Sequence, residues 1–275
     1  MEILNYSFFQ NALLGSILCS VLCGLMGTYI VSRRLVFISG GLTHASLGGI
    51  GLGVFLGCNP LLSAMLFAVG SACGVQWMTH GGRVREDSAI AIFWTLGMSI
   101  GIIFSFLTPG FVTDLNSYLF GSILTVGATE LWLLTAVTAV VVIFFLSYMR
   151  TIICIAFDPV FARSQRLPVA VIEYLMMVLI AMTIVATLRM VGIVLAISLL
   201  TIPQTTATLF THRFQRMITL SILFGCVGCV IGLAVSYWLN IPSGAAIIFV
   251  SIMIYILLKT IKTIVTSLIR SDETS

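Results

Sequence analysis

The sequence predicts an all-α, polytopic integral membrane protein with a single transmembrane domain over residues 1–275. The composition is the first reason: 60% of the residues are hydrophobic, only 8% are charged, and the mean hydropathy is +1.18. A soluble domain carries roughly 25% charged residues. A surface this apolar fits lipid, where side chains that face outward are apolar as well.

Hydrophobic runs of spanning length are the second reason. Crossing a bilayer as a helix takes roughly 20 predominantly apolar residues. The pattern predicts about nine transmembrane helices, with about eight as the alternative count. The runs lie at about 10–31, 35–57, 61–79, 88–107, 128–148, 170–188, 191–210, 217–239 and 243–262.

The positive charges are the third reason, and they also predict an orientation. Cytoplasmic loops of membrane proteins carry an excess of Lys and Arg. If alternate connections face the cytoplasm, they hold all of the 13 Lys and Arg residues except Arg189. This split predicts an N-terminus outside, a C-terminus inside, and a 35–57 run that crosses the membrane.

The 35–57 run contains an interruption followed by an ionisable residue. We expect the helix to break at Ser39, Gly40 and Gly41, where glycine would let the chain turn and expose carbonyl oxygens. Broken helices are tolerated only where protein or a water-filled cavity covers them, and in transporters they often mark the substrate site. His44 would then lie roughly 15 Å from the cytoplasmic surface.

His44 is the only histidine that we expect inside a span. Ionisable residues at that depth are costly and usually functional. Imidazole suits zinc, iron and, less strongly, manganese. His44 is therefore a candidate metal ligand. The alternative, that it hydrogen-bonds a neighbouring helix and only packs, stays open.

Small residues and cysteines within the spans are expected to pack. Ala45, Gly49, Gly53 and Gly57 recur at four-residue spacing and form a smooth face, which favours close contact between helices in membranes. Cys226 and Cys229 form a C-x-x-C in an apolar run. Core packing is the favoured interpretation there, with soft-metal ligation as the alternative.

Several chemistries are disfavoured by what the sequence lacks. The acidic residues fall in connections or near span ends, whereas a proton- or sodium-coupled carrier normally needs a carboxylate within the membrane. Neither lysine follows the glycines of a P-loop, so any ATP hydrolysis is expected on a separate chain. Motifs of hydrolytic enzymes are also missing, so we do not expect an enzyme.

The loop over residues 150–168 is the longest connection that we expect in the cytoplasm. Asp158 followed by Pro159 predicts a helix N-cap with proline at the first helical position. A short helix with apolar and basic residues would follow. Phe161 could dock in a groove of a partner protein. The alternative is a solvated helix at the membrane surface.

Five segments, taken in order, resemble one known family. The first runs from Gly27 to Gly53 and reads GTYIVSRRLVFISGGLTHASLGGIGLG. The others are Asp114-Leu115 with Tyr118-Leu119-Phe120-Gly121, FDPVFARSQRLPV over 157–169, VGIVLAISLLTIPQTTA over 191–207, and Pro242-Ser243-Gly244. Together they resemble the permease subunits of bacterial ATP-binding-cassette (ABC) importers for zinc, manganese and iron.

The resemblance implies a function and a set of partners. The chain would be the transmembrane permease of an ATP-driven importer of divalent metal ions in the bacterial inner membrane. It would pair with a second copy of itself, two cytoplasmic ATPases and an extracytoplasmic metal-binding protein. The metal would be the substrate, and we expect no permanently bound cofactor and no nucleic acid. The alternatives are a permease for a metal chelate and an ion-coupled secondary metal carrier.

The resemblance also implies site residues. The metal pathway would include His44 as a ligand, with Ser39 and Thr43 nearby and the helix break at Gly40 and Gly41. The ATPase would contact residues of the 150–168 loop, namely Asp158, Pro159, Phe161, Ala162, Arg163 and Arg166.

Two positions depart from the family pattern. The family usually carries an aspartate four residues before the histidine, where this chain has Gly40. The family's second metal ligand is therefore missing. The family also usually has a glycine in the coupling loop, where this chain has Arg166.

Overall fold

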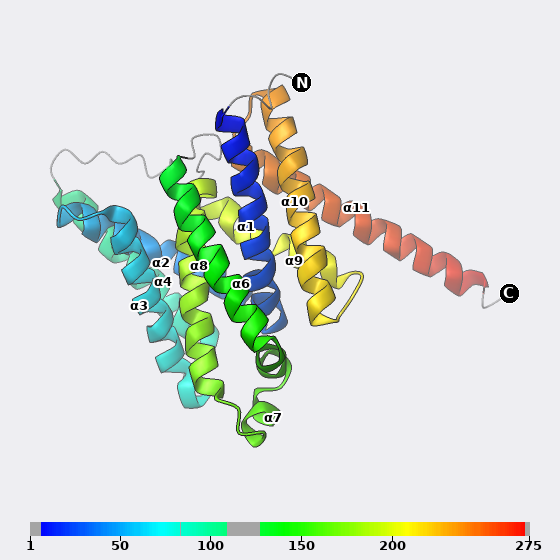
Figure 1. Cartoon of the computed structure of the whole chain (residues 1–275), viewed down its shortest axis with the longest axis horizontal. Helices are drawn as coiled ribbons and strands as arrows, with labels where there is room; N and C mark the ends of the chain where they lie inside the picture. The colour runs from blue at the N-terminus through cyan, green and yellow to red at the C-terminus, as the bar shows by residue number, and fades with distance from the viewer. Residues whose placement is uncertain (1–6, 83, 109–126, 273–275) are drawn as a thin grey trace.

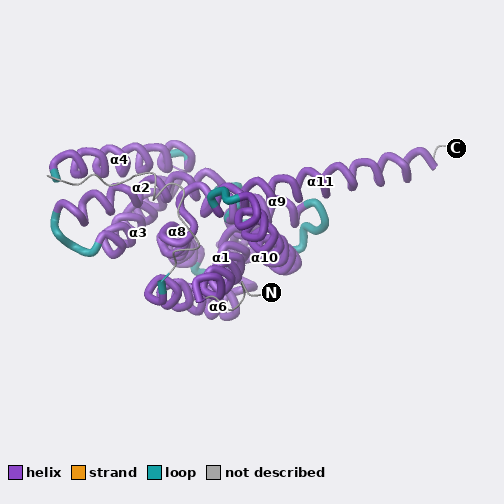
Figure 2. The backbone as a smooth tube through the Cα atoms, turned by 90° about the horizontal axis from the view of Figure 1, so that it is seen from above, coloured by secondary structure: helices purple, strands orange, loops and turns teal. Residues whose placement is uncertain are grey.

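The computed structural model describes residues 7–82, 84–108 and 127–272, and within these residues all regular elements are helical (Figure 2). The segment 109–126, which holds Asp114-Leu115 and Tyr118 to Gly121, lies outside the described residues. The elements are α1 Ser7–Ser32, α2 Val36–Phe55, α3 Pro60–Thr79, η2 His80–Gly82, α4 Glu86–Leu107, α6 Ala128–Phe157, α7 Pro159–Ser164, α8 Val169–Leu199, α9 Ile202–Thr208, α10 Phe214–Leu239 and α11 Ser243–Asp272.

The predicted polytopic membrane protein is confirmed. Among the described residues, 8 helical segments are long and apolar enough to span a membrane. Two of them, Val169–Leu188 and Val191–Thr208, come from the stretch that α8 and α9 cover. α2 is as long as α3 but falls outside this set, because glycine, serine, threonine and histidine dilute its apolar residues. The count of about nine is reached only if α2 also crosses.

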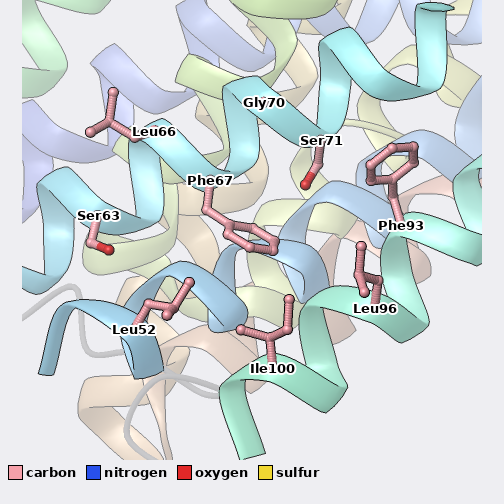
Figure 3. Close-up of a pocket in the computed structure, with 9 residues that line it drawn as sticks. All are labelled: Leu52, Ser63, Leu66, Phe67, Gly70, Ser71, Phe93, Leu96 and Ile100. Carbon is pink, nitrogen blue, oxygen red and sulfur yellow. The ribbon is translucent and has the colours of Figure 1, made fainter. Parts of the chain in front are cut away.

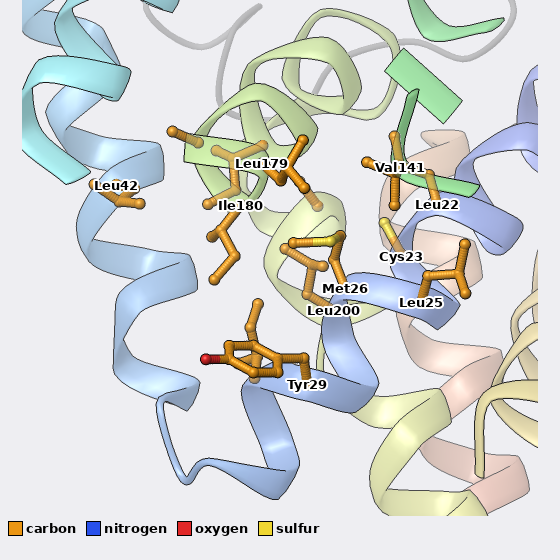
Figure 4. Packing of buried hydrophobic residues seen from close by; sticks show 14 of the residues in the cluster. Leu22, Cys23, Leu25, Met26, Tyr29, Leu42, Val141, Leu179, Ile180 and Leu200 are labelled. Atoms are coloured by element: carbon orange, nitrogen blue, oxygen red, sulfur yellow. The ribbon is translucent and has the colours of Figure 1, made fainter. Parts of the chain in front are cut away.

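The helices form a long bundle with a smaller group beside it. α1, α6, α8 and α10 lie along one another, α2, α3 and α4 gather on one side, and α11 extends away on the other (Figure 1). The apolar core lies where α1 meets α6 and α8. Figure 4 shows Leu22 and Met26 of α1 in this core with Val141 of α6 and Ile180 of α8, all of them buried.

α7 marks one end of the bundle, and several other helix ends meet it there (Figure 1). Phe157, which ends α6, lies 6.3 Å from Phe214, which begins α10, between ring centroids. Arg33, just after α1, pairs with Glu173 near the start of α8. This end of the bundle therefore gathers basic residues from connections that the charge pattern assigns to one side. The orientation in the membrane stays a prediction.

The predicted break at Ser39–Gly41 is wrong, because α2 continues through it from Val36 to Phe55. Gly41 makes room for a neighbour instead of turning the chain. A Cβ on Gly41 would lie only 2.3 Å from Cγ2 of Ile90 in α4. The Ser39 hydroxyl donates to the Val36 carbonyl at 2.7 Å, and the Thr43 hydroxyl donates to the Ser39 carbonyl. In this helical geometry the carbonyls of this stretch point along the helix axis toward amides one turn later.

The interruptions lie elsewhere. One is at Tyr148 inside α6, with φ −117° and ψ 16°, and two more lie in the stretch of α8 and α9. Gly192 has φ 76° and ψ 171° inside α8, a backbone conformation open mainly to glycine. α8 ends at Leu199, and α9 begins after Thr201. Fully buried Gln204 covers the interruption between α8 and α9. Its Nε2 donates to the Leu199 carbonyl at 3.0 Å and to the Cys23 carbonyl of α1 at 2.8 Å.

Small residues hold α2 close to both of its neighbours. Gly49 and Gly53 of the predicted face pack on α3, whereas Gly48, which the spacing did not single out, packs on α4. A Cβ on Gly49 would lie 2.5 Å from the Ser63 carbonyl oxygen of α3, so Gly49 packs directly on that backbone. On the α4 side, a Cβ on Gly48 would lie 2.6 Å from the Gly97 carbonyl oxygen. A Cβ on Gly97 would lie 2.5 Å from the Cα of Ala45. The α2–α4 contact is therefore backbone against backbone.

Gly97→Ala should destabilise the protein, because its new methyl group would meet the Ala45 backbone and force α2 and α4 apart. We expect a loss of about 1–3 kcal/mol, as for other overpacked cores. Thermal unfolding of the purified protein in detergent measures it. Gly70→Ala in α3 is the matched control, since a Cβ there meets nothing within 4 Å. An equal loss in both variants would show that the α2–α4 contact is not the cause.

Candidate functional site

The His44 side chain lies against a tryptophan of the next helix but one. The His44 and Trp94 rings are stacked, with centroids 4.8 Å apart and planes 5° apart. Trp94 of α4 is itself held, since its Nε1 donates to the Met98 Sδ at 3.1 Å. Stacking thus orients the His44 ring, and its buried Nδ1 atom has no hydrogen-bond partner among the described residues.

Ser39 and Thr43, the other predicted pathway residues, are fully buried. Each hydroxyl donates to a carbonyl of α2 itself. The sequence brings them close to His44 along the chain, but both donor hydrogens are engaged within the helix. Their part in a metal pathway stays a prediction.

Gly40 lies on the face of α2 that Trp94 covers. A Cβ on Gly40 would come within 3.8 Å of Trp94 Cζ3 and 3.9 Å of the Ile197 side chain, both ordinary contact distances. The position has room for a side chain next to the His44–Trp94 stack. The aspartate that the resemblance led us to expect here would have projected into this place, one helical turn before His44.

The described part of one chain does not assemble a complete metal site. No group of three or more His, Cys, Asp or Glu residues that could hold an ion gathers in it. The pocket in Figure 3, of about 420 Å³, lies between α2, α3 and α4 and does not include His44. Its lining is apolar apart from the hydroxyls of Ser63 and Ser71. Its chemistry suits a hydrocarbon chain better than a cation.

The predicted helix in the 150–168 loop is confirmed as α7. The carboxylate of Asp158 accepts from the backbone amides of Val160 at 3.0 Å and Phe161 at 2.8 Å, and Pro159 is the first helical residue. Ala162 is fully buried against the bundle, whereas Val160 is 72% and Phe161 53% exposed. α7 lies at one end of the bundle (Figure 1), and the exposure of these two residues shows that it presents apolar side chains outward.

Arg163 and Arg166 add positive charge beside these exposed apolar side chains. Arg166 has φ 58°, in the left-handed region that favours glycine. Its amide donates to the Arg163 carbonyl at 3.0 Å and so closes the end of α7. The glycine that the resemblance led us to expect at this position has a conformational reason, and this chain places an arginine in the same turn.

Two features of the site were not predicted from the sequence. Trp94 gave no signal, because nothing in a sequence links a lone aromatic residue in one span to a histidine in another. The ion pair of Arg33 with Glu173 did leave a signal. Glu173 lies within the apolar 170–188 run, and a buried carboxylate requires a partner.

A bundle of apolar helices, with a half-buried histidine inside and an exposed short helix at one end, defines a polytopic membrane protein. Comparison with known proteins places it more closely. The ABC 3 transport family matches residues 5–262. The chain therefore belongs to the ABC 3 transport family, and the resemblance noted in the sequence is confirmed.

Individual relatives align along nearly the whole chain. The uncharacterized membrane protein slr2045 of Synechocystis sp. is 40% identical over 257 residues, 94% of this chain and 92% of the relative. The manganese transport system membrane protein MntC of Halalkalibacterium halodurans is 33% identical over 256 residues, 93% of this chain and 88% of the relative. The solved structure of PsaBC from Streptococcus pneumoniae in complex with Fab has a TM-score of 0.82 at 28% identity, with 94% of this chain and 92% of that chain covered.

Arg166→Gly should stabilise the end of α7, because it removes a Cβ from a left-handed residue at a cost of roughly 1–2 kcal/mol. Part of that gain is lost to the greater freedom of glycine in the unfolded chain, which leaves about 0.5–1 kcal/mol. Slower hydrogen exchange at the Leu167 amide, which bonds the Ala162 carbonyl, would report the gain. Arg163→Gly, inside α7, should act in the opposite direction. Faster exchange in both variants would contradict the conformational explanation.

Proposed function

We propose that this protein is the permease subunit of an ATP-driven importer of divalent metal ions. The observation that carries the proposal is the family match over residues 5–262, together with the alignment of 93% of the chain to a manganese transport membrane protein. Manganese is the first metal to test, and zinc and iron follow, since imidazole binds all three.

His44 is the proposed metal-contacting residue of the pathway. It is the one histidine within α2, α3 and α4, and its Nδ1 has no hydrogen-bond partner among the described residues. Trp94 stacks on the imidazole ring with the two planes 5° apart and so holds the plane of that ring. A single histidine without a neighbouring carboxylate offers a divalent ion only one ligand, which suits a site that must release its ion.

A second copy of the chain would complete the pathway. One histidine is too few for a stable metal site, since divalent transition metals take four or more ligands. Two copies related by a two-fold axis would bring two His44 side chains to a shared path. An extracytoplasmic metal-binding protein would deliver the ion to the end of the bundle opposite α7.

The α7 end is the proposed docking site for a separate ATPase, in the cytoplasm. Val160 and Phe161 are exposed apolar side chains on a capped helix, and such a helix fits a groove on a partner. Arg163 and Arg166 would set its orientation through charge. ATP binding and hydrolysis would move α7, and the helices joined to it would open the path alternately to either side.

His44→Ala should lower ATP-dependent metal uptake by about tenfold or more, as expected when a metal site loses a ligand or its support. Manganese uptake into proteoliposomes that contain the permease with its co-expressed ATPase measures this. Association with the ATPase should be unchanged. His212→Ala is the matched control, because His212 is exposed in the turn before α10. Wild-type uptake by His44→Ala would assign the residue to packing alone.

Trp94→Leu should reduce the same uptake by about tenfold, because an aliphatic side chain does not hold the imidazole plane. Trp94→Phe should keep most of the activity through a stacked ring. Trp77→Leu serves as the control, since Trp77 is 71% exposed on α3. Equal uptake by Trp94→Leu and Trp77→Leu would show that the stack has no part in transport.

A further inference from the structure

Arg33 forms a buried polar cluster at the α7 end of the bundle. Its Nη2 donates to Glu173 Oε1 at 3.0 Å, and its Nη1 donates to the Ile155 carbonyl at 3.3 Å. The other carboxylate oxygen of Glu173, Oε2, accepts from Gln76 Nε2 at 3.3 Å. We call Arg33, Glu173, Gln76 and the Ile155 carbonyl the Arg33 cluster. The side chains of the ion pair are only 16% and 9% exposed.

The Arg33 cluster joins the turn between α1 and α2 to three helices, α3, α6 and α8. Ile155 lies in the last turn of α6, and Glu173 lies near the start of α8. α6 and α8 are the two helices that flank α7 in the chain. Arg33 itself lies in the short turn between α1 and α2, and α2 carries His44. The Arg33 guanidinium group, just before the start of α2, therefore bonds to both α6 and α8, the helices that α7 connects.

Stability alone gives little reason for such a pair. Removing two charges from water costs about as much as their attraction returns, so apolar replacements of buried pairs are often neutral or stabilising. What the pair adds is geometry, because charge-assisted hydrogen bonds fix distance and direction. A different ion pair at the same end, Arg85 with Asp87 at 3.8 Å, is 86% and 69% exposed and lacks this constraint.

We propose that the Arg33 cluster is the positioning link that carries movement of α7 to α2 and so couples the ATPase to the metal pathway. The inference rests on the proposed function, since α7 moves in this way only if an ATPase docks on it. When α6 and α8 shift with α7, the Ile155 carbonyl and the Glu173 carboxylate change position together. Arg33, which is hydrogen-bonded to both, moves with them. The short turn from Arg33 to α2 passes that shift to the helix of His44.

The test separates coupling from folding. In the permease co-purified with its ATPase, Glu173→Gln and Arg33→Met each leave one partner of the buried pair unmatched. The double variant Arg33→Met with Glu173→Met replaces the pair by two apolar side chains of similar length. The double variant of the exposed pair, Arg85→Met with Asp87→Met, is the matched control. Thermal unfolding, ATPase association, ATP hydrolysis and manganese uptake are measured for each in proteoliposomes.

We expect the double variant of the buried pair to fold and to bind the ATPase, with a smaller loss of thermal stability than either single variant, because it leaves no buried charge unpaired and only the Gln76 amide and the Ile155 carbonyl lose a partner. Its manganese uptake per ATP hydrolysed should fall by about fivefold or more, the range of typical coupling between sites. The control should match the wild type in all four measurements. A double variant with wild-type uptake per ATP would overturn the inference and make the pair a structural contact only. If the wild type itself shows no ATP-dependent uptake, the proposed function fails instead.

Discussion

The rest of this structure depends on one constraint, which is that lipid offers the backbone no hydrogen-bond partner. Every amide and carbonyl within the membrane must be satisfied by the protein. That constraint explains why the described elements are helices and why the interruptions near Gly192 and Thr201 lie in a crowded part of the bundle. Gln204 shows the solution at one of them, since its side-chain amide bonds the Leu199 carbonyl and a carbonyl of α1.

The same constraint shapes the region around His44. α2 stays an unbroken helix, so its backbone carbonyls accept hydrogen bonds within the helix and are not free to bind an ion. Glycines instead bring α2 and α4 into backbone contact, and this close approach places Trp94 directly on the imidazole ring. The pathway proposed here therefore relies on an oriented side chain rather than on unwound backbone. At the α7 end, the charged groups of Arg33 and Glu173 pair with one another.

Much of the fold could be predicted from the sequence, because long apolar runs and the positions of basic residues report directly on the membrane. The short helix α7 was also predictable, since Asp158 and Pro159 form a local cap signal. The prediction of a break at Ser39–Gly41 was wrong because glycine in a membrane helix allows either a turn or close contact with a neighbouring helix. The contact between Gly41 and Ile90 of α4 shows that close packing occurs here, and the sequence does not reveal that contact. Trp94 and the Arg33 cluster depend on contacts between distant helices, which periodicity and composition do not encode.

The most direct test of the central claim is manganese uptake into proteoliposomes that contain this permease and its co-purified ATPase. Uptake is compared with ATP, with a non-hydrolysable ATP analogue, and with an ion gradient alone. We expect uptake that requires hydrolysable ATP on the side of the vesicle where α7 is exposed. Uptake driven by an ion gradient without ATP would contradict it.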